Sequence, residues 1–126
     1  MPVQYVGRGL GKIFKYAPNM KKKWILAENQ RPRMVDGVEV TKEDNRFTVY
    51  RYIEDWDEDG DTIYSVDEYL SNIPETALKP AIKADSDGEV IQWFKSHLIE
   101  SQSNSLDAIE AFLKEHNVPF RYDGSY

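Results

Sequence analysis

The sequence of 126 residues contains no cysteine, only two histidines and no long apolar segment. The lack of cysteine excludes disulfides, thiolate metal ligands and cysteine nucleophiles, and it fits a reducing compartment. No apolar run approaches the roughly 20 residues of a membrane-spanning helix, and residues 1–12 lack the apolar core of a signal peptide. We therefore expect a cytoplasmic protein that does not enter a membrane.

Phosphate-binding loops are also missing, although glycine recurs near the N-terminus at Gly7, Gly9 and Gly11. A Walker loop needs four residues between its glycines and then Lys followed by Ser or Thr, but Lys12 is followed by Ile13. A dinucleotide fingerprint fails too, because no strand precedes the glycines. We expect residues 1–11 to form a flexible basic arm that leads into a short strand over residues 12–17.

Charge is distributed unevenly along the chain, whose net charge is −6. Residues 1–51 carry 11 Lys and Arg against 5 Asp and Glu, whereas residues 52–126 carry 5 against 17, so the halves have net charges of +6 and −12. Two interpretations stay open. The halves pack together and neutralise each other, or the acidic half presents its field to a basic partner.

Residues 46–69 form the stretch around which the chain is organised. Phe47, Val49 and Ile53 alternate with polar and aromatic residues, which is the two-residue period of a strand. Gly60 suits a chain reversal, and residues 62–66 provide a second strand. The predicted hairpin has a solvated acidic loop with a tryptophan among its carboxylates. This loop and the following strand supply the candidate acidic surface: Glu54, Asp55, Trp56, Asp57, Glu58, Asp59, Asp61 and Tyr64.

Upstream of that hairpin, short strands are predicted. Residues 24–27 form an apolar strand candidate, and residues 34–40 form a two-residue hairpin with a type I′ turn at Asp36 and Gly37. Residues 31–33 are then a loop, and residues 42–45 are a polar connection. The first half is therefore predicted to be an antiparallel meander.

Downstream, the pattern changes to helical. Ser65 and Glu68 have capping-box spacing, so residues 67–73 are predicted to form one or two helical turns. Pro74 and Pro80 bracket residues 75–79 and prevent a long helix there.

Two amphipathic helices follow. Ser86 and Glu89 repeat the capping box before a helix over residues 89–99. Ser105 caps a second helix, which stops at Asn117, and residues 120–122 form a short edge strand.

The predicted fold is α+β, an antiparallel meander from the first half with two C-terminal amphipathic helices packed on one face. We expect a single domain over residues 1–126, with the arm at 1–11, strands at 12–66 and a mainly helical part at 67–126.

No pattern predicts catalysis or metal binding. Asp57, Asp59, Asp61 and Glu68 occupy four places of a calcium loop, but Thr62 stands where Gly is required and a strand precedes the loop. The two histidines, at 97 and 116, suit helix flanks and ends, and no spacing supports a serine triad. We expect a non-enzymatic protein without metal or cofactor.

The leading hypothesis for function is a small inhibitor-type, protein-binding module. Its acidic surface would mimic nucleic acid and bind a basic site on a nucleic-acid-handling protein, as viral proteins and inhibitors from phages and other mobile elements do. The analogy is one of composition only. Trp56 and Tyr64 are the expected aromatic anchors.

Two alternatives remain. The chain could bind nucleic acid or a nucleotide through a basic, aromatic N-terminal segment, in which cations contact phosphate and rings stack on bases. The residues of this alternative basic site are Arg8, Lys12, Lys15, Lys21, Lys22, Lys23 and Trp24. The other alternative is a homo-oligomeric assembly protein in which basic and acidic halves of neighbouring subunits meet.

Overall fold

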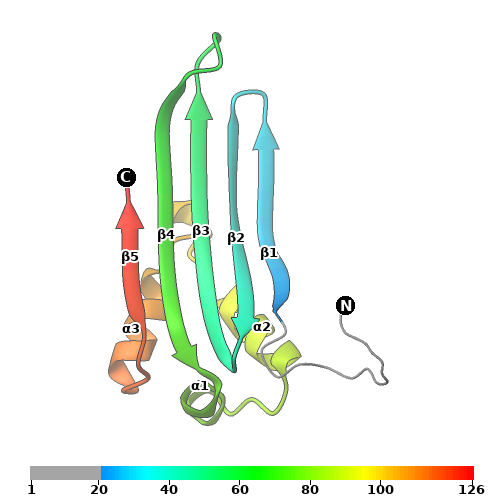
Figure 1. The fold of residues 1–126 in the computed structure, drawn as a ribbon, viewed down its shortest axis with the longest axis vertical. Coiled ribbons are helices and arrows are strands. Elements are labelled where there is room, and N and C mark those ends of the chain that lie inside the picture. Colours follow the sequence, from blue (N-terminus) through cyan, green and yellow to red (C-terminus); the bar gives the residue numbers. More distant parts are fainter. Residues whose placement is uncertain (1–20) are drawn as a thin grey trace.

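The computed structural model describes residues 21–126, which form a five-stranded antiparallel sheet with helices against one face (Figure 1). The strands lie in sequence order, and all neighbours are antiparallel. Along the chain the elements are β1 (Lys22–Arg31), β2 (Met34–Glu43), β3 (Arg46–Trp56), β4 (Thr62–Pro74), α1 (Glu75–Ile82), α2 (Asp87–Ser96), the 3-10 turn η1 (Glu100–Gln102), α3 (Asp107–Glu115) and β5 (Arg121–Ser125).

The core lies between the sheet and the helices. Phe47 and Val49 of β3 are fully buried, and Phe94 of α2 meets Phe47 edge to face with ring centroids 6.1 Å apart. Figure 1 shows α2 and α3 behind the lower part of the sheet and α1 at the lower end of β4, while the upper ends of β1 to β4 extend beyond the helices. The fold is therefore α+β as predicted, with a meander of strands and helices packed on one face.

The central hairpin is confirmed. β3 and β4 pair from Arg46 opposite Pro74 to Trp56 opposite Thr62, and Gly60 has a φ of 87° in the loop between them. The polar connection predicted at residues 42–45 contains the turn between β2 and β3. Asp44 and Asn45 both have positive φ there, at 53° and 59°, as a tight hairpin turn requires.

The hairpin predicted within residues 34–40 is wrong. Asp36 and Gly37 lie inside β2, and the chain reverses earlier, at Pro32 and Arg33. Gly37 is required in the strand for a packing reason. A β-carbon there would lie 2.8 Å from the Ala27 carbonyl oxygen and against the ring of its cross-strand partner Tyr52.

The helical turns predicted at residues 67–73 are also wrong, because this segment continues β4 as far as Pro74. Neither Ser65 nor Glu68 caps a helix. Glu68 instead points towards the core side of the sheet and binds Arg51, with 3.2 Å between Oε1 and Nη1. The helix that follows is short, as expected, but α1 continues through Pro80 to Ile82.

The C-terminal elements are confirmed with shifted ends. The Ser86 hydroxyl accepts a hydrogen bond from the Glu89 backbone N–H, so α2 is capped as predicted, but it ends at Ser96 rather than at residue 99. The cap predicted at Ser105 is wrong, because the N-cap residue of α3 is Leu106, which makes no side-chain cap hydrogen bond. Ser105 precedes it, and its Oγ accepts from the backbone N–H of Asp107 at 3.2 Å. The edge strand exists as β5, beside β4, so residues 67–126 contain strands at both ends.

The arm predicted at residues 1–11 and the strand predicted at 12–17 lie outside the described residues. Within residues 21–126, no helix is long and apolar enough to cross a membrane.

Candidate functional site

The face of the sheet turned away from the helices is the main candidate site, and we call it the open face. Alternation along each strand determines its residues. On β3, Phe47, Val49 and Ile53 are buried, so the intervening side chains point to the other side. The chemically distinctive residues of the open face are Glu39, Tyr50, Tyr52, Glu54, Asp67 and Tyr69.

Three tyrosines form a cluster at its centre. Tyr50 and Tyr69 are cross-strand partners whose rings stack with centroids 4.5 Å apart and an interplanar angle of 12°. Tyr52 lies 5.4 Å from Tyr50, between centroids. Such pairs contribute about 0.5–1.5 kcal/mol each beyond the area that they bury. The cluster is thus a rigid aromatic surface.

Burial and neighbouring groups raise the pKa of two tyrosines of this cluster, Tyr50 and Tyr52. The Tyr50 hydroxyl donates to Asp67 Oδ1. Burial, this hydrogen bond and the neighbouring Tyr69 raise the pKa of Tyr50 well above its ordinary value. Burial and the charges of Glu28, Glu39 and Asp36 also raise the pKa of Tyr52. Both phenols are therefore neutral at physiological pH, which suits binding rather than base catalysis.

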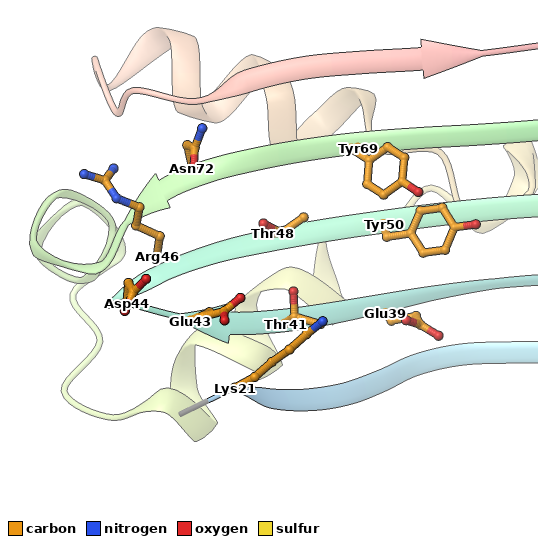
Figure 2. A pocket seen from close by; sticks show the side chains of 10 residues that line it. All are labelled: Lys21, Glu39, Thr41, Glu43, Asp44, Arg46, Thr48, Tyr50, Tyr69 and Asn72. Carbon is orange, nitrogen blue, oxygen red and sulfur yellow. The ribbon is translucent and has the colours of Figure 1, made fainter. Parts of the chain in front are cut away.

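Two shallow grooves flank Tyr50 on the open face. One has a volume of about 600 Å³ and runs along β2, β3 and β4 (Figure 2). The other, of about 320 Å³, is lined by Tyr52, Glu54 and Asp67 and leads towards the tip of the β3–β4 hairpin. Figure 2 shows Tyr50 and Tyr69 side by side at one end of the first groove, with Arg46 and Asn72 at the other. Both grooves are open to solvent, so the face is uneven but does not enclose a ligand.

The carboxylates of the open face are only partly neutralised. Glu39 pairs with Lys23 at 3.3 Å. Glu54 accepts a hydrogen bond from Thr62, and Asp67 accepts one from Tyr50, but neither has an ion-pair partner among residues 21–126. The aromatic cluster is therefore bordered by negative charge that is available to a partner.

The hairpin loop, residues 57–61, forms an acidic tip with defined geometry. The Asp57 carboxylate accepts backbone hydrogen bonds from Asp59 at 2.9 Å and Asp61 at 3.0 Å, which makes it the structural anchor of the loop. Glu58 pairs with Arg33 of the adjacent turn at 3.6 Å, in an exposed position. Asp59 and Asp61 have no ion pair within the described part of the chain.

The two predicted anchors differ in exposure. Tyr64 is 51% exposed and its neighbour Ile63 is 65% exposed, so both are accessible. Trp56 is half-buried, and its backbone N–H donates to the Arg33 carbonyl at 3.0 Å, which ties the β3–β4 hairpin to the β1–β2 turn. Glu54 and Asp55, predicted as loop residues, lie in β3. The structure thus distributes the predicted acidic surface over the tip and the strand ends.

The alternative basic site is described only in part, because Arg8, Lys12 and Lys15 lie outside residues 21–126. Lys21 lines the larger groove, Lys22 is 3.7 Å from Asp87, and Lys23 pairs with Glu39. The Trp24 ring packs against the core. It is therefore not presented for stacking on a base.

Oppositely charged residues from the two halves of the chain do meet. Lys42 of β2 binds Glu75 of α1 and Asp87 of α2, each at 2.9 Å, and Arg51 binds Glu68. This supports the first interpretation of the charge asymmetry for the buried groups. The open face and the tip keep an excess of carboxylates.

The histidines occupy the ends of α2 and α3. His97 stacks on Trp93, with centroids 4.3 Å apart, and His116 stacks on Phe112 at 3.9 Å. Their ring nitrogens lie near the carbonyls four residues earlier, a local structural role. Among residues 21–126, no three His, Cys, Asp or Glu side chains are grouped so that they could hold a metal ion.

Sequence reasoning missed the tyrosine cluster as a site. The helical turns predicted at residues 67–73 include Tyr69, and a helix there would not place its ring against that of Tyr50 on β3. The available signal was the alternation of Val66, Glu68 and Leu70 with Asp67 and Tyr69, which continues the strand.

Comparison of the chain with known protein families, with curated proteins and with solved structures finds no match in any of the three.

Proposed function

We propose that this protein is a non-enzymatic interaction module that binds a basic surface of another protein through the open face and the acidic tip. One observation carries the proposal. The Tyr50, Tyr52 and Tyr69 cluster lies on a sheet face that no helix or strand of residues 21–126 covers. It is bordered by carboxylates that have no ion-pair partner in the same range. Rigid tyrosines are efficient contact residues because they bring a large area with few torsions to immobilise.

The sign of the charge favours a protein partner over nucleic acid. Phosphate would be repelled by Glu54, Asp67 and the tip carboxylates, whereas lysine and arginine side chains would be attracted. The same charge supports the more specific proposal that the partner handles nucleic acid and that this protein inhibits it by occupying a phosphate-binding surface.

The test begins with capture of binding proteins from the source cells, using the tagged full chain as bait. The purified partner is then measured at two salt concentrations against matched variants. Asp59→Lys with Asp61→Lys changes the tip, and Asp85→Lys with Glu115→Lys changes net charge equally at exposed positions elsewhere. Asp57 is left intact because it anchors the loop.

We expect the tip variant to weaken binding about tenfold or more and the control about twofold or less, with the wild-type affinity falling as salt rises. Tyr69→Ala should accelerate dissociation, with thermal unfolding used to confirm that it folds. The proposal is wrong if the two charge variants bind equally well and Tyr69→Ala dissociates at the wild-type rate. If the partner carries a phosphate-binding site, nucleic acid should compete for it.

A further inference from the structure

A polar cavity of about 510 Å³ lies on the other side of the molecule from the tyrosine cluster, between the β1–β2 hairpin and the segment that follows α2. The charged residues that line it come from both the β1–β2 hairpin and the segment after α2. Glu28, Arg31 and Asp36 belong to the strands, and Glu100 belongs to η1. Glu28 lies opposite Gly37, and its charge acts on Tyr52. The remaining carboxylates, those of Asp36 and Glu100, outnumber the single guanidinium of Arg31, so the cavity favours a cation.

Two lining side chains are buried and polar. Asp36 is 5% exposed, and its carboxylate accepts from Asn29 Nδ2 at 3.1 Å and pairs with Arg31 at 3.6 Å. A carboxylate has about four acceptor positions, so it can accept more. Asn104 is 8% exposed, and its carboxamide makes no hydrogen bond with any residue in the range 21–126. A buried amide without a partner in this range is costly, which favours a ligand that bonds to it.

The turn that presents Asn104 is held in place. Ser103 and Asn104 have successive φ values of 56° and 61°, in the left-handed region that serine adopts reluctantly. Arg51 Nε donates to the Ser103 carbonyl at 3.0 Å, which fastens the turn to β3. Conformations of this kind persist where surrounding contacts impose them, often beside ligands.

We propose that this cavity binds a guanidinium cation, carried either by a small molecule or by an arginine side chain of another protein. The guanidinium ion is planar, always charged and rich in donors, so it can bond to the Asp36 carboxylate and the Asn104 carboxamide oxygen together. The cavity is too large for a bare ion, and the described residues offer no metal-ligand group there. The inference is independent of the function proposed for the open face.

The experiment is an NMR titration of the isotope-labelled full chain. The probes are agmatine, as a free guanidinium compound, and the capped tripeptide Gly-Arg-Gly. Its counterpart with citrulline, which has the same shape but no charge, is the control probe. Guanidinium probes should shift the amides of residues 103 and 104 saturably, and the citrulline peptide should bind about tenfold or more weakly.

Asn104→Gly removes the carboxamide yet suits the positive φ, so it should fold. Asn117→Gly is its matched control, since Asn117 has a φ of 56° at an exposed position after α3. We expect Asn104→Gly and Asp36→Asn each to weaken binding about tenfold and Asn117→Gly to leave it unchanged.

The relative affinities identify the source of the guanidinium. Tighter binding of agmatine indicates a small molecule, and tighter binding of the peptide indicates a protein side chain. The proposal is overturned if no probe shifts these amides saturably up to about 10 mM, a concentration well above a millimolar Kd. It is equally overturned if the citrulline peptide binds as well, or if Asn104→Gly binds like Asn117→Gly.

Discussion

Replacing Lys42 with methionine should destabilise the fold in a way that depends on pH. Lys42 is 15% exposed and connects the sheet to two helices, with its Nζ 2.9 Å from Glu75 Oε2 and 2.9 Å from Asp87 Oδ1. Lys79 contacts the same two carboxylates. Methionine preserves most of the apolar stem and removes the charge.

The size of the effect follows from partial burial. Exposed ion pairs contribute about 0–1 kcal/mol, whereas breaking a fully buried pair costs about 3–5 kcal/mol. The side chains of this network are 15–22% exposed, and Lys79 would still neutralise one carboxylate. We therefore expect Lys42→Met to lower the free energy of unfolding by about 2 kcal/mol at neutral pH.

The sign of the pH dependence follows from the pKa shifts. Burial opposes ionisation of Glu75 and Asp87, but hydrogen bonds from both lysines outweigh it and lower the pKa of each carboxyl. Their stabilisation is present above the ordinary carboxyl pKa and is lost as pH falls through the lowered one, so the wild-type advantage should shrink below about pH 4. Burial alone would lower the pKa of Lys42, but the hydrogen bonds and charges of Glu75 and Asp87 outweigh burial and raise it. At alkaline pH the advantage should disappear only above about pH 10.4.

Urea unfolding across this pH range measures the difference directly. Lys114→Met is the matched control, because Lys114 pairs with Glu110 at 3.4 Å but is 67% exposed. It should cost less than about 0.5 kcal/mol at any pH. The reasoning is refuted if Lys42→Met and Lys114→Met lose the same stability, or if the Lys42→Met deficit is the same at pH 7 and in acid.

Three further predictions concern the sheet. Gly37→Ala should lower the free energy of unfolding in urea by about 1–3 kcal/mol, because its β-carbon would lie 2.8 Å from a β1 carbonyl oxygen. The control Gly88→Ala should be tolerated, because its β-carbon meets nothing closer than 3.8 Å. Equal losses of stability in the two variants would contradict this. Asp67→Asn should lower the pKa of Tyr50 towards its ordinary value, since it removes a carboxylate that helps to raise it. An unchanged tyrosinate absorbance titration would contradict a role of Asp67. Glu68→Gln should accelerate amide exchange in β5 more than in β1, because both tyrosine hydroxyls of the C-terminal segment donate to Glu68; equal acceleration in both edge strands would oppose it.

The sequence predicts the fold class because most strands and helices here have an unambiguous period. It fails in the second half of β4, where Val66, Leu70 and Ile73 have helical spacing although all three are buried in a strand. The bulge between β3 and β4 near Phe47 shifts the register and hides the two-residue period. Pairing with β3 and β5, which no local pattern encodes, decides the conformation.

Only the part of the candidate site that is formed by residues close together in the sequence can be predicted from the sequence. The acidic tip follows from composition, since clustered carboxylates stay solvated. The tyrosine cluster depends on strand register, which places Tyr69 opposite Tyr50 and Tyr52 over Gly37. The interpretation of Asp36 and Gly37 as a turn failed for the same reason. Glycine permits both a reversal and a close approach of a ring, and only the neighbouring strand distinguishes them.

An uncovered face is ordinary for an antiparallel sheet, so exposure alone does not indicate binding. This face is distinguished by two kinds of group. The carboxylates of the tip act on a partner at a distance, and the stacked tyrosine rings act only in contact. Asp59 and Asp61 stand on a loop anchored by Asp57, so their charge acts from a fixed position. Such charge governs the rate of encounter and is screened by salt, whereas stacked rings act only after contact and govern dissociation. If both serve one partner, salt should slow association with little effect on dissociation, and tyrosine replacement should do the reverse.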